Sequence, residues 1–396
     1  MVLNRHHLIL TAILAIALIP RLFMLNRVAP DDLYASPWYA GGQGDATEYS
    51  AIAVNLVRGE GYTLAGRETT IRPPGYVYFV AGVYAAFGIE NHTAVRAVQI
   101  ALAIVTLVFF WRLAKNLTES RNTAHVATLM LGLYPRYAIY NLTLLSETLF
   151  LALMVYAIYT AECFAARRHR LFFALSMATL ALAALTRPPA LYAAPVFLGW
   201  GLWVARQGMG NRGLGIGDAR REVMRTLLTA FTVFLLALAP WILYNYARLG
   251  TFTFTTKSGG GLAEAWDRTV LAPLGISDRD ILSPYLHLDE TAFSDAGYRL
   301  FFTEIRDHPL LVAKFTVLKS LYWLSPSAHI ASRPLNSLHT ALTSAMMLLG
   351  ALGIYQYART KKNPVLVLIL LVMAAFSAMY ILTVPYHRYR FPVTFP

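Results

Sequence analysis

The stretch "GDATEYSAIAVNLVRGEGY", residues 44–62, places acidic side chains at helical spacing. Asp45 and Glu48 are three positions apart, and Tyr49 follows one position later, so on a helix all of them share a face. A carboxylate here could act as a general base or orient an acceptor hydroxyl group. The alternative is a helix start, in which Asp45 is the N-cap and Glu48 completes a capping box. The two roles are compatible in one residue.

A second acid, Glu147, lies in the apolar stretch "YNLTLLSETLF". An ionisable group between leucines is costly at a membrane boundary unless it faces a cavity or a partner. The alternative is again local, because an acid suits the first turn of a helix. We treat Asp45 and Glu147 as the candidate catalytic residues, with both alternatives open.

Arg72 precedes Pro73 and Pro74, a pair that favours an extended segment followed by a helix start. This arrangement would hold Arg72 at the membrane surface, where the simplest role is a snorkelling arginine. Further basic residues expected on the same side are Arg187, Lys257, Arg388 and Arg390. Such cations need an anionic partner, and a lipid-linked phosphate would supply one. Ordinary phospholipid headgroups are the alternative.

The composition excludes most soluble classes. The chain has 396 residues, of which 57% are hydrophobic and 14% charged, whereas soluble proteins have about 25% charged residues. The apolar runs do not alternate with period two, so helices rather than barrel strands are expected to span the membrane. The fold class is therefore all-α and multi-span. The single cysteine, Cys163, permits no internal disulfide, and no nucleotide-binding loop or zinc-ligand spacing is present.

The net charge of +13 comes from basic residues in short gaps between apolar runs. The positive-inside rule places these gaps, for example the one with Arg167 and Arg168, in the cytoplasm, together with the N-terminus. Consistent sidedness then requires 74–88 and 309–324 to lie in the outer interface, since both are shorter than the roughly 20 residues of a span. The runs expected to cross are 8–28, 94–114, 123–140, 147–165, 171–187, 189–206, 226–246, 338–358 and 363–384.

This threading leaves two large outer segments, residues 29–93 and 247–337, within one membrane domain covering 1–396. The first run resumes after Arg21, so we expect an uncleaved span rather than a signal peptide. The chain stops at "RFPVTFP", which leaves open a further span beyond it.

Several motifs in order carry a family resemblance: "GDATEYSAIAVNLVRGEGY", "IRPPGYVYFVAGVYAAFG", "AVRAVQIALAIVTLVFFWRLAKNL", "LLSETLF", "PWILYNYARLGTFTFTTKSGGG" and "HRYRFPV". The sequence resembles bacterial relatives of the protein O-mannosyltransferases and of the lipid A aminoarabinose transferase. These are membrane glycosyltransferases of the C superfamily, in its family 39-like branch. The resemblance covers nearly the whole chain, and it depends on the order and spacing of the motifs rather than on any single one.

The resemblance implies a helical bundle with juxtamembrane helices on its outer face. It also implies transfer of a sugar, with inversion, from a polyprenyl-phosphate carrier to a protein, lipid or envelope glycan. Asp45 matches the presumed catalytic carboxylate, and Glu147 matches a second-loop acid that is often Asp. Arg72 matches a residue that contacts the carrier phosphate and is often Lys. For acceptor or sugar contacts we select Glu48, Tyr49, Tyr76 and His387.

No cofactor is expected. Some superfamily relatives use a divalent metal, but this sequence lacks a clear ligand set beyond the two acids. We expect a bacterial plasma-membrane enzyme with its active site on the outer face, and no nucleic-acid partner. The alternatives left open are a lipid-linked glycan ligase or polymerase, a flippase or secondary transporter, and a structural membrane protein.

Overall fold

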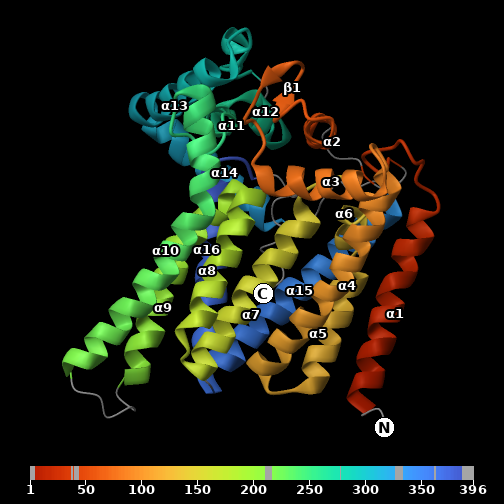
Figure 1. Cartoon of the computed structure of the whole chain (residues 1–396), viewed down its shortest axis with the longest axis vertical. Coiled ribbons are helices and arrows are strands. Elements are labelled where there is room, and N and C mark those ends of the chain that lie inside the picture. Colours follow the sequence, from red (N-terminus) through yellow and green to blue (C-terminus); the bar gives the residue numbers. More distant parts are fainter. Residues whose placement is uncertain are drawn as a thin grey trace.

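The computed structural model describes residues 5–36, 39, 44–209, 216–276, 278–325, 333–360 and 363–385. Upright helices form a bundle, and shorter elements gather over one of its ends (Figure 1). The upright helices are α1 (Arg5–Leu25), α4 (His92–Thr118), α5 (Arg121–Leu133), α7 (Glu147–Arg167), α8 (Arg170–Thr186), α9 (Ala194–Met209), α10 (Ile216–Leu249), α15 (Arg333–Thr360) and α16 (Pro364–Leu382).

Two stretches of chain supply the elements over that end. The first contains α2 (Asp45–Val57), a hairpin of β1 (Thr63–Leu64) and β2 (Arg67–Glu68), and α3 (Pro74–Phe87). The second contains α11 (Lys257–Ala263), η2 (Glu264–Trp266), α12 (Arg268–Leu271), η3 (Ala272–Leu274), η4 (Ser283–Tyr285), α13 (Glu290–Asp307) and α14 (Pro309–Leu324). Two short elements remain: α6 (Pro135–Tyr140) and η1 (Pro188–Ala193).

The all-α membrane fold is confirmed. Among the described residues, five helices are long and apolar enough to cross a membrane: α1, α4, α7, Gly217–Leu249 within α10, and α16. Shorter apolar helices are α3, α8 and Ser337–Gly353 within α15. α3 lies across the ends of the upright helices (Figure 1), as expected of a helix in the interface. The full threading and its sidedness stay predictions.

Two expected spans differ from the structure, and prolines lie at both departures. Residues 123–140 are not one helix, because the backbone is extended at Tyr134 and α6 restarts at Pro135. Residues 189–206 begin within the 3-10 helix η1, which has Pro188 and Pro189 in its first turn, and α9 begins only at Ala194.

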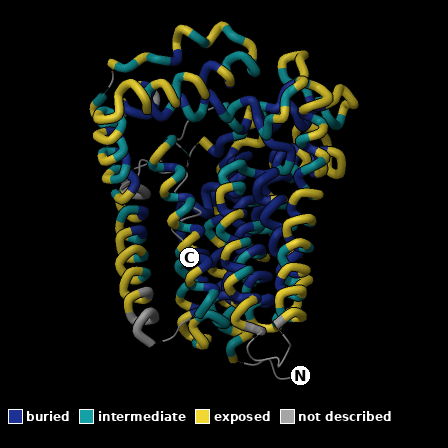
Figure 2. Tube along the Cα trace, turned by 90° about the vertical axis from the view of Figure 1, so that its left-hand side faces the viewer, coloured by how far each residue is buried: buried dark blue, intermediate teal, exposed yellow. Residues whose placement is uncertain are grey.

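Large apolar side chains face outward from the bundle, for example Leu8, Ile19, Leu182, Leu236 and Leu371. Buried residues lie between the helices and exposed ones on the outside (Figure 2). A soluble protein would not expose so much apolar surface, whereas lipid covers it in a membrane protein.

The connection that leads into α7 is fixed by side chains of α4. Gln99 donates from Nε2 to the carbonyl oxygens of Asn141, at 3.1 Å, and Thr143, at 2.8 Å. Arg96 donates from Nε to the carbonyl of Leu142 at 3.0 Å. Buried carbonyls without partners would be costly, so these bonds fix the path of the chain just before Glu147.

Candidate active site

Asp45 is the first residue of α2, and its side chain does not cap the helix. The N-cap is Gly44, which has a φ of 124° and makes no side-chain cap bond. The Oδ1 atom of Asp45 lies 2.5 Å from Nη2 of Arg72, and Oε2 of Glu48 lies 2.5 Å from Nε of the same arginine. The capping-box interpretation is therefore wrong: the spacing of the two acids serves to hold one guanidinium group.

Arg72 is fixed from several directions. Pro73 is extended, with φ −65° and ψ 151°, and α3 begins at Pro74, as the double proline predicts. The Arg72 carbonyl accepts a hydrogen bond from Tyr62 at 2.9 Å, and its guanidinium lies 5.2 Å from the ring centroid of Tyr49. Burial disfavours the charged form, but the acidic groups of Tyr49, Asp45 and Glu48 outweigh it and raise the pKa of Arg72.

A second buried ion pair joins α7 to the end of α8. Arg187, the C-cap residue of α8, places Nη1 at 2.7 Å from Oε1 of Glu147, the first residue of α7. Glu147 is 2% exposed, and its Oε2 atom has no hydrogen-bond partner among the described residues. A buried carboxylate oxygen in this state can accept a bond from a ligand.

Ser146 links the two ion pairs. Its Oγ atom accepts from Nη1 of Arg187 at 3.2 Å and from the hydroxyl of Tyr49 at 3.5 Å. The ring of Tyr49 packs against Arg72, so one chain of contacts runs from the first outer segment to α7 and α8. Burial raises the pKa of Tyr49, which keeps this hydroxyl protonated as a donor.

Lys257 reaches the same place from the start of α11, where its Nζ lies 3.9 Å from Oδ1 of Asp45. Its approach depends on close packing of α11 against α13. A Cβ atom on Gly259 would lie 1.8 Å from the carbonyl oxygen of Ser294, so only glycine fits at that position.

A single carboxylate fastens the two outer segments together. Oε1 of Glu290 accepts from the hydroxyl of Thr69 at 2.7 Å, and Oε2 accepts from the hydroxyl of Thr256 at 2.8 Å. Beside it, the hydroxyl of Thr255 donates to the carbonyl of Ile71 at 2.9 Å. These bonds hold the residue before Arg72 against the residues before Lys257.

The ion pairs open onto a cavity of about 450 Å³. Its charged and polar wall includes Asp45, Tyr49, Arg72, Ser146, Arg187, Lys257, Ser258 and Glu264. Its apolar wall includes Ile71, Leu191, Phe252, Phe254, Leu262, Met379 and Val384. The cavity thus combines three cations, two carboxylates (Asp45 and Glu264) and an apolar side, an arrangement that suits an amphiphilic anion.

The structure brings most of the predicted site residues together, with some corrections. Glu48 and Glu147 do not line the cavity; each is held behind it by an arginine that does. Tyr76 as a sugar contact is wrong, because this residue is fully buried and donates its hydroxyl to Gln99 at 2.7 Å. Its ring supports that of Tyr49 edge-on, with the centroids 4.8 Å apart. The predicted residues His387, Arg388 and Arg390 lie outside the described residues.

Sequence reasoning missed other lining residues, including Thr186, Tyr298, Tyr380 and Thr383. It also missed Lys319 of α14, which is fully buried and donates to the carbonyls of Leu382 and Thr383 at 3.2 Å each. Desolvation lowers the pKa of Lys319 to about 7. Nothing in the sequence around Lys319 indicates that its amine would bond to the end of α16 beside the cavity.

The donor set does not fit a divalent metal. Throughout the described ranges, no group of three or more His, Cys, Asp or Glu residues is placed to hold one. Asp45 and Glu147 are each paired with an arginine, and cations beside a carboxylate oppose the approach of another cation. We therefore derive no chemical step through a metal.

Comparison with known proteins gives a family match and a fold. Residues 71–244 match the family model described as dolichyl-phosphate-mannose-protein mannosyltransferase. No curated protein is similar enough in sequence to count as a match.

Among solved structures, the apo oligosaccharyltransferase of Archaeoglobus fulgidus is similar with a TM-score of 0.58 and 13% identity, over 97% of this chain and 49% of that one. The archaeal oligosaccharyltransferase AglB from Archaeoglobus fulgidus, in complex with an inhibitory peptide and a dolichol-phosphate, gives a TM-score of 0.51 and 13% identity, over 97% of this chain and 49% of that one. ArnT from Cupriavidus metallidurans bound to undecaprenyl phosphate gives a TM-score of 0.44 and 14% identity, over 96% of this chain and 77% of that one.

The chain spans about half the length of the archaeal enzyme. At this level of identity the likeness concerns the fold alone, while the family match concerns residues 71–244. The family match over residues 71–244 and the shared fold over nearly the whole chain confirm the resemblance to the membrane glycosyltransferases of the C superfamily.

Proposed function

We propose that the chain transfers a sugar from a polyprenyl-phosphate carrier to a protein, lipid or envelope-glycan acceptor, with inversion at the anomeric carbon. The reaction takes place in the cavity at the capped end of the bundle, which we assign to the outer face of a bacterial plasma membrane. The observation that carries this proposal is the cavity wall, which holds Asp45, Arg72, Arg187 and Lys257 together with apolar side chains.

The leaving group in this reaction is a polyprenyl phosphate, which is already a stable anion. It needs cations to hold its charge rather than an acid to protonate it. Arg187 and Lys257 suit this role because both line the cavity: Nη1 of Arg187 lies 2.7 Å from Oε1 of Glu147, and Nζ of Lys257 lies 3.9 Å from Oδ1 of Asp45. Arg72 is more fully engaged, with two carboxylates at 2.5 Å.

Asp45 is the best candidate for the base. The acceptor hydroxyl attacks the anomeric carbon, a new carbon–oxygen bond forms, and the bond from that carbon to the phosphate oxygen breaks. The acceptor proton passes to Asp45, and the polyprenyl phosphate leaves with its negative charge held by the cations. Glu147 positions Arg187 from behind the cavity wall.

The test uses the full chain, purified in detergent and supplied with a bacterial membrane lipid extract as the donor source. We expect mass spectrometry to find a polyprenyl phosphate, with or without a sugar, among the co-purifying lipids. We also expect its sugar to be transferred to a component of the same extract. Co-purification of phospholipid alone, with no sugar released from any lipid fraction, would overturn the proposal. Transfer of a polymer in place of one sugar would instead favour a ligase or polymerase.

A further inference from the structure

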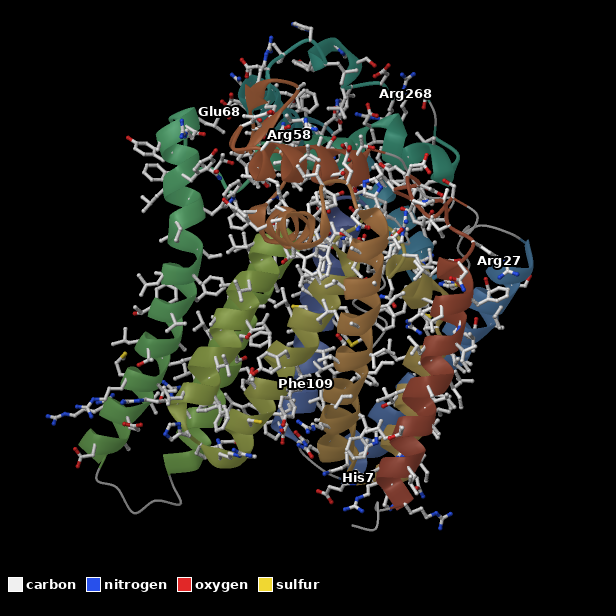
Figure 3. The ribbon with its side chains drawn as sticks, turned by 45° about the vertical axis from the view of Figure 1, so that its right-hand side comes forward. His7, Arg27, Arg58, Glu68, Phe109 and Arg268 are labelled. Carbon is white, nitrogen blue, oxygen red and sulfur yellow. The ribbon has the colours of Figure 1, made fainter. Side chains whose placement is uncertain are left out.

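A second cavity of about 450 Å³ lies among the ends of four upright helices. Its residues come from α1, α4, α5 and α7 and are His6, His7, Leu10, Val108, Trp111, Arg112, Lys115, Asn116, Arg121 and Tyr159. We call it the basic pocket. Figure 3 shows His7 at the end of the bundle opposite to Arg58 and Glu68, so the basic pocket is far from the candidate active site.

The cations of the basic pocket are not engaged in ion pairs with the described acids. Within the described part of the chain, Arg112, Lys115 and Arg121 form no ion pair. Their contacts are with rings instead: the guanidinium of Arg112 lies 5.8 Å from the Phe109 centroid, and Nζ of Lys115 lies 5.6 Å from that of Trp111. The positive-inside rule explains basic residues at this end, but not their arrangement around a cavity.

A buried donor provides the independent observation. Trp111 is 7% exposed, and its Nε1 donor finds no acceptor among the described residues. Beside it lies His125, 6% exposed, with neither ring nitrogen bonded; the ring centroids are 5.6 Å apart. A buried N–H without an acceptor costs free energy, which a bound oxygen-rich anion would recover.

The nearby acids limit where such an anion can lie. Glu119 and Glu162 line an adjoining hollow together with Lys115, Asn116 and Arg121. Glu162 also accepts a hydrogen bond from Asn116 at 3.0 Å. Repulsion from these carboxylates leaves the side formed by Trp111 and Arg112 as the place for negative charge.

We propose that the basic pocket binds a phosphate group. Phosphate oxygens accept strong bonds from guanidinium and ammonium groups, and also from an indole N–H. The apolar Leu10 and Val108 in the same wall suit the lipid below a headgroup. Basic pockets between membrane helices take lipid phosphates in this way. The same chemistry would accept inorganic phosphate, so the test separates the two sources.

The test compares purified full-length protein with two matched double variants. Arg112→Gln/Lys115→Gln removes two charges from the basic pocket. Arg220→Gln/Arg221→Gln removes two exposed charges from α10, outside the basic pocket. Native mass spectrometry measures retained phosphatidylglycerol against phosphatidylcholine. We expect the pocket variant to lose phosphatidylglycerol affinity by about tenfold or more, while the α10 variant stays like wild type.

Inorganic phosphate forms the second arm, without added lipid. A rise in the midpoint of thermal unfolding with phosphate, against chloride at equal ionic strength, that the pocket variant lacks would identify free phosphate as the ligand. Retained phosphatidylglycerol without that rise would identify a lipid headgroup. Either result supports the proposal; equal behaviour of wild type and pocket variant in both arms would overturn it.

Trp111→Phe is a milder variant that keeps the ring and removes only the N–H donor. We expect it to fold and to bind phosphatidylglycerol several-fold more weakly. If neither Trp111→Phe nor Arg112→Gln/Lys115→Gln changes phosphatidylglycerol binding, the cations of the basic pocket only help to orient the protein in the membrane. The result is independent of sugar transfer, because the basic pocket shares no residue with the candidate active site.

Discussion

Nζ of Lys257 lies 3.9 Å from Oδ1 of Asp45, although the two residues come from different outer segments. The same oxygen atom lies 2.5 Å from Nη2 of Arg72. One carboxylate oxygen is therefore shared by two cations of unequal proximity.

Asp45→Asn should abolish most turnover without unfolding the protein. Gly44 is the N-cap of α2, so the substitution disturbs no cap, and asparagine keeps the size of the side chain. If Asp45 takes the acceptor proton, turnover should fall by about 10²–10⁴, measured as sugar transfer from a membrane extract.

The matched control for that variant is Asp289→Asn at the start of α13. Asp289 caps its helix by accepting from the amide of Ala292 at 2.8 Å, and asparagine caps about equally well, so transfer should be unchanged. Near-normal transfer by folded Asp45→Asn protein would remove the case for this base. Glu147→Gln would then become the variant to examine.

Arg72→Ala should destabilise the protein by about 3 kcal/mol, because removal of one partner of a buried ion pair leaves uncompensated charge. Arg72→Lys should recover only part of this loss, since one ammonium cannot replace the Nε and Nη2 contacts to two separate carboxylates. Thermal unfolding in detergent measures both effects.

Arg248→Ala serves as the comparison for Arg72→Ala. The pair of Arg248 and Glu68 has a similar distance, 2.8 Å, but both side chains are about half exposed. Exposed pairs contribute about 0–1 kcal/mol. An Arg72→Ala variant as stable as Arg248→Ala would contradict a structural role for the guanidinium between the two acids.

Gly259→Ala should destabilise the outer segment and reduce transfer, since its Cβ would lie 1.8 Å from the carbonyl of Ser294. Overpacking of this kind costs about 1–3 kcal/mol, and it moves Lys257 away from Asp45. Gly261→Ala, in the same helix, has nothing within 4 Å of its added Cβ. It should be neutral or stabilising by up to about 1 kcal/mol. Because Gly261 also lines the cavity, the comparison is made on stability, and equal stability for the two variants would refute the close packing.

Lys319 should give the protein a pH-dependent stability. Above about pH 7 the folded protein holds Lys319 neutral, because burial lowers its pKa to about 7, whereas the unfolded chain keeps this amine protonated up to its ordinary pKa of 10.5. The unfolded state therefore binds more protons between these values, and stability rises with pH across the window.

Lys319→Met should remove that rise, whereas Lys314→Met, at an exposed position of the same helix, should leave it intact. The measurement is the midpoint of thermal unfolding from about pH 6 to about pH 9. If the unfolding midpoint of Lys319→Met still rises with pH, groups other than Lys319 cause the pH dependence of stability.

The sequence predicts the helical membrane fold well, because apolar runs and basic gaps report directly on the bilayer. It also identifies Asp45, Arg72, Arg187 and Lys257 as one group, through the need of each charge for a partner. It does not predict which charges meet. The contacts of Asp45 with Arg72 and Lys257 cross 27 and 212 positions of sequence, and the helical spacing of Asp45 and Glu48 equally favours a cap.

Tyr76 shows a related limit. It follows Pro74 by two positions, but side-chain direction on α3 depends on which face packs inward, and the face that carries Tyr76 meets Gln99. Lys319 shows another limit. Residues 309–324 are expected in the membrane interface, yet the Lys319 amine is fully buried against carbonyl groups.

The contacts described between the two outer segments are polar: hydroxyl groups bonded to Glu290 and to one carbonyl oxygen, and the charge pairs Asp45–Lys257 and Glu68–Arg248. Heat capacity changes with the apolar area that meets water, and contacts of this kind cover little such area. If the cavity opens between the two outer segments to admit a bulky donor, the enthalpy of opening should hardly vary with temperature. Opening and global unfolding would then be distinguishable by calorimetry, since only unfolding exposes the aromatic and aliphatic side chains that pack the bundle.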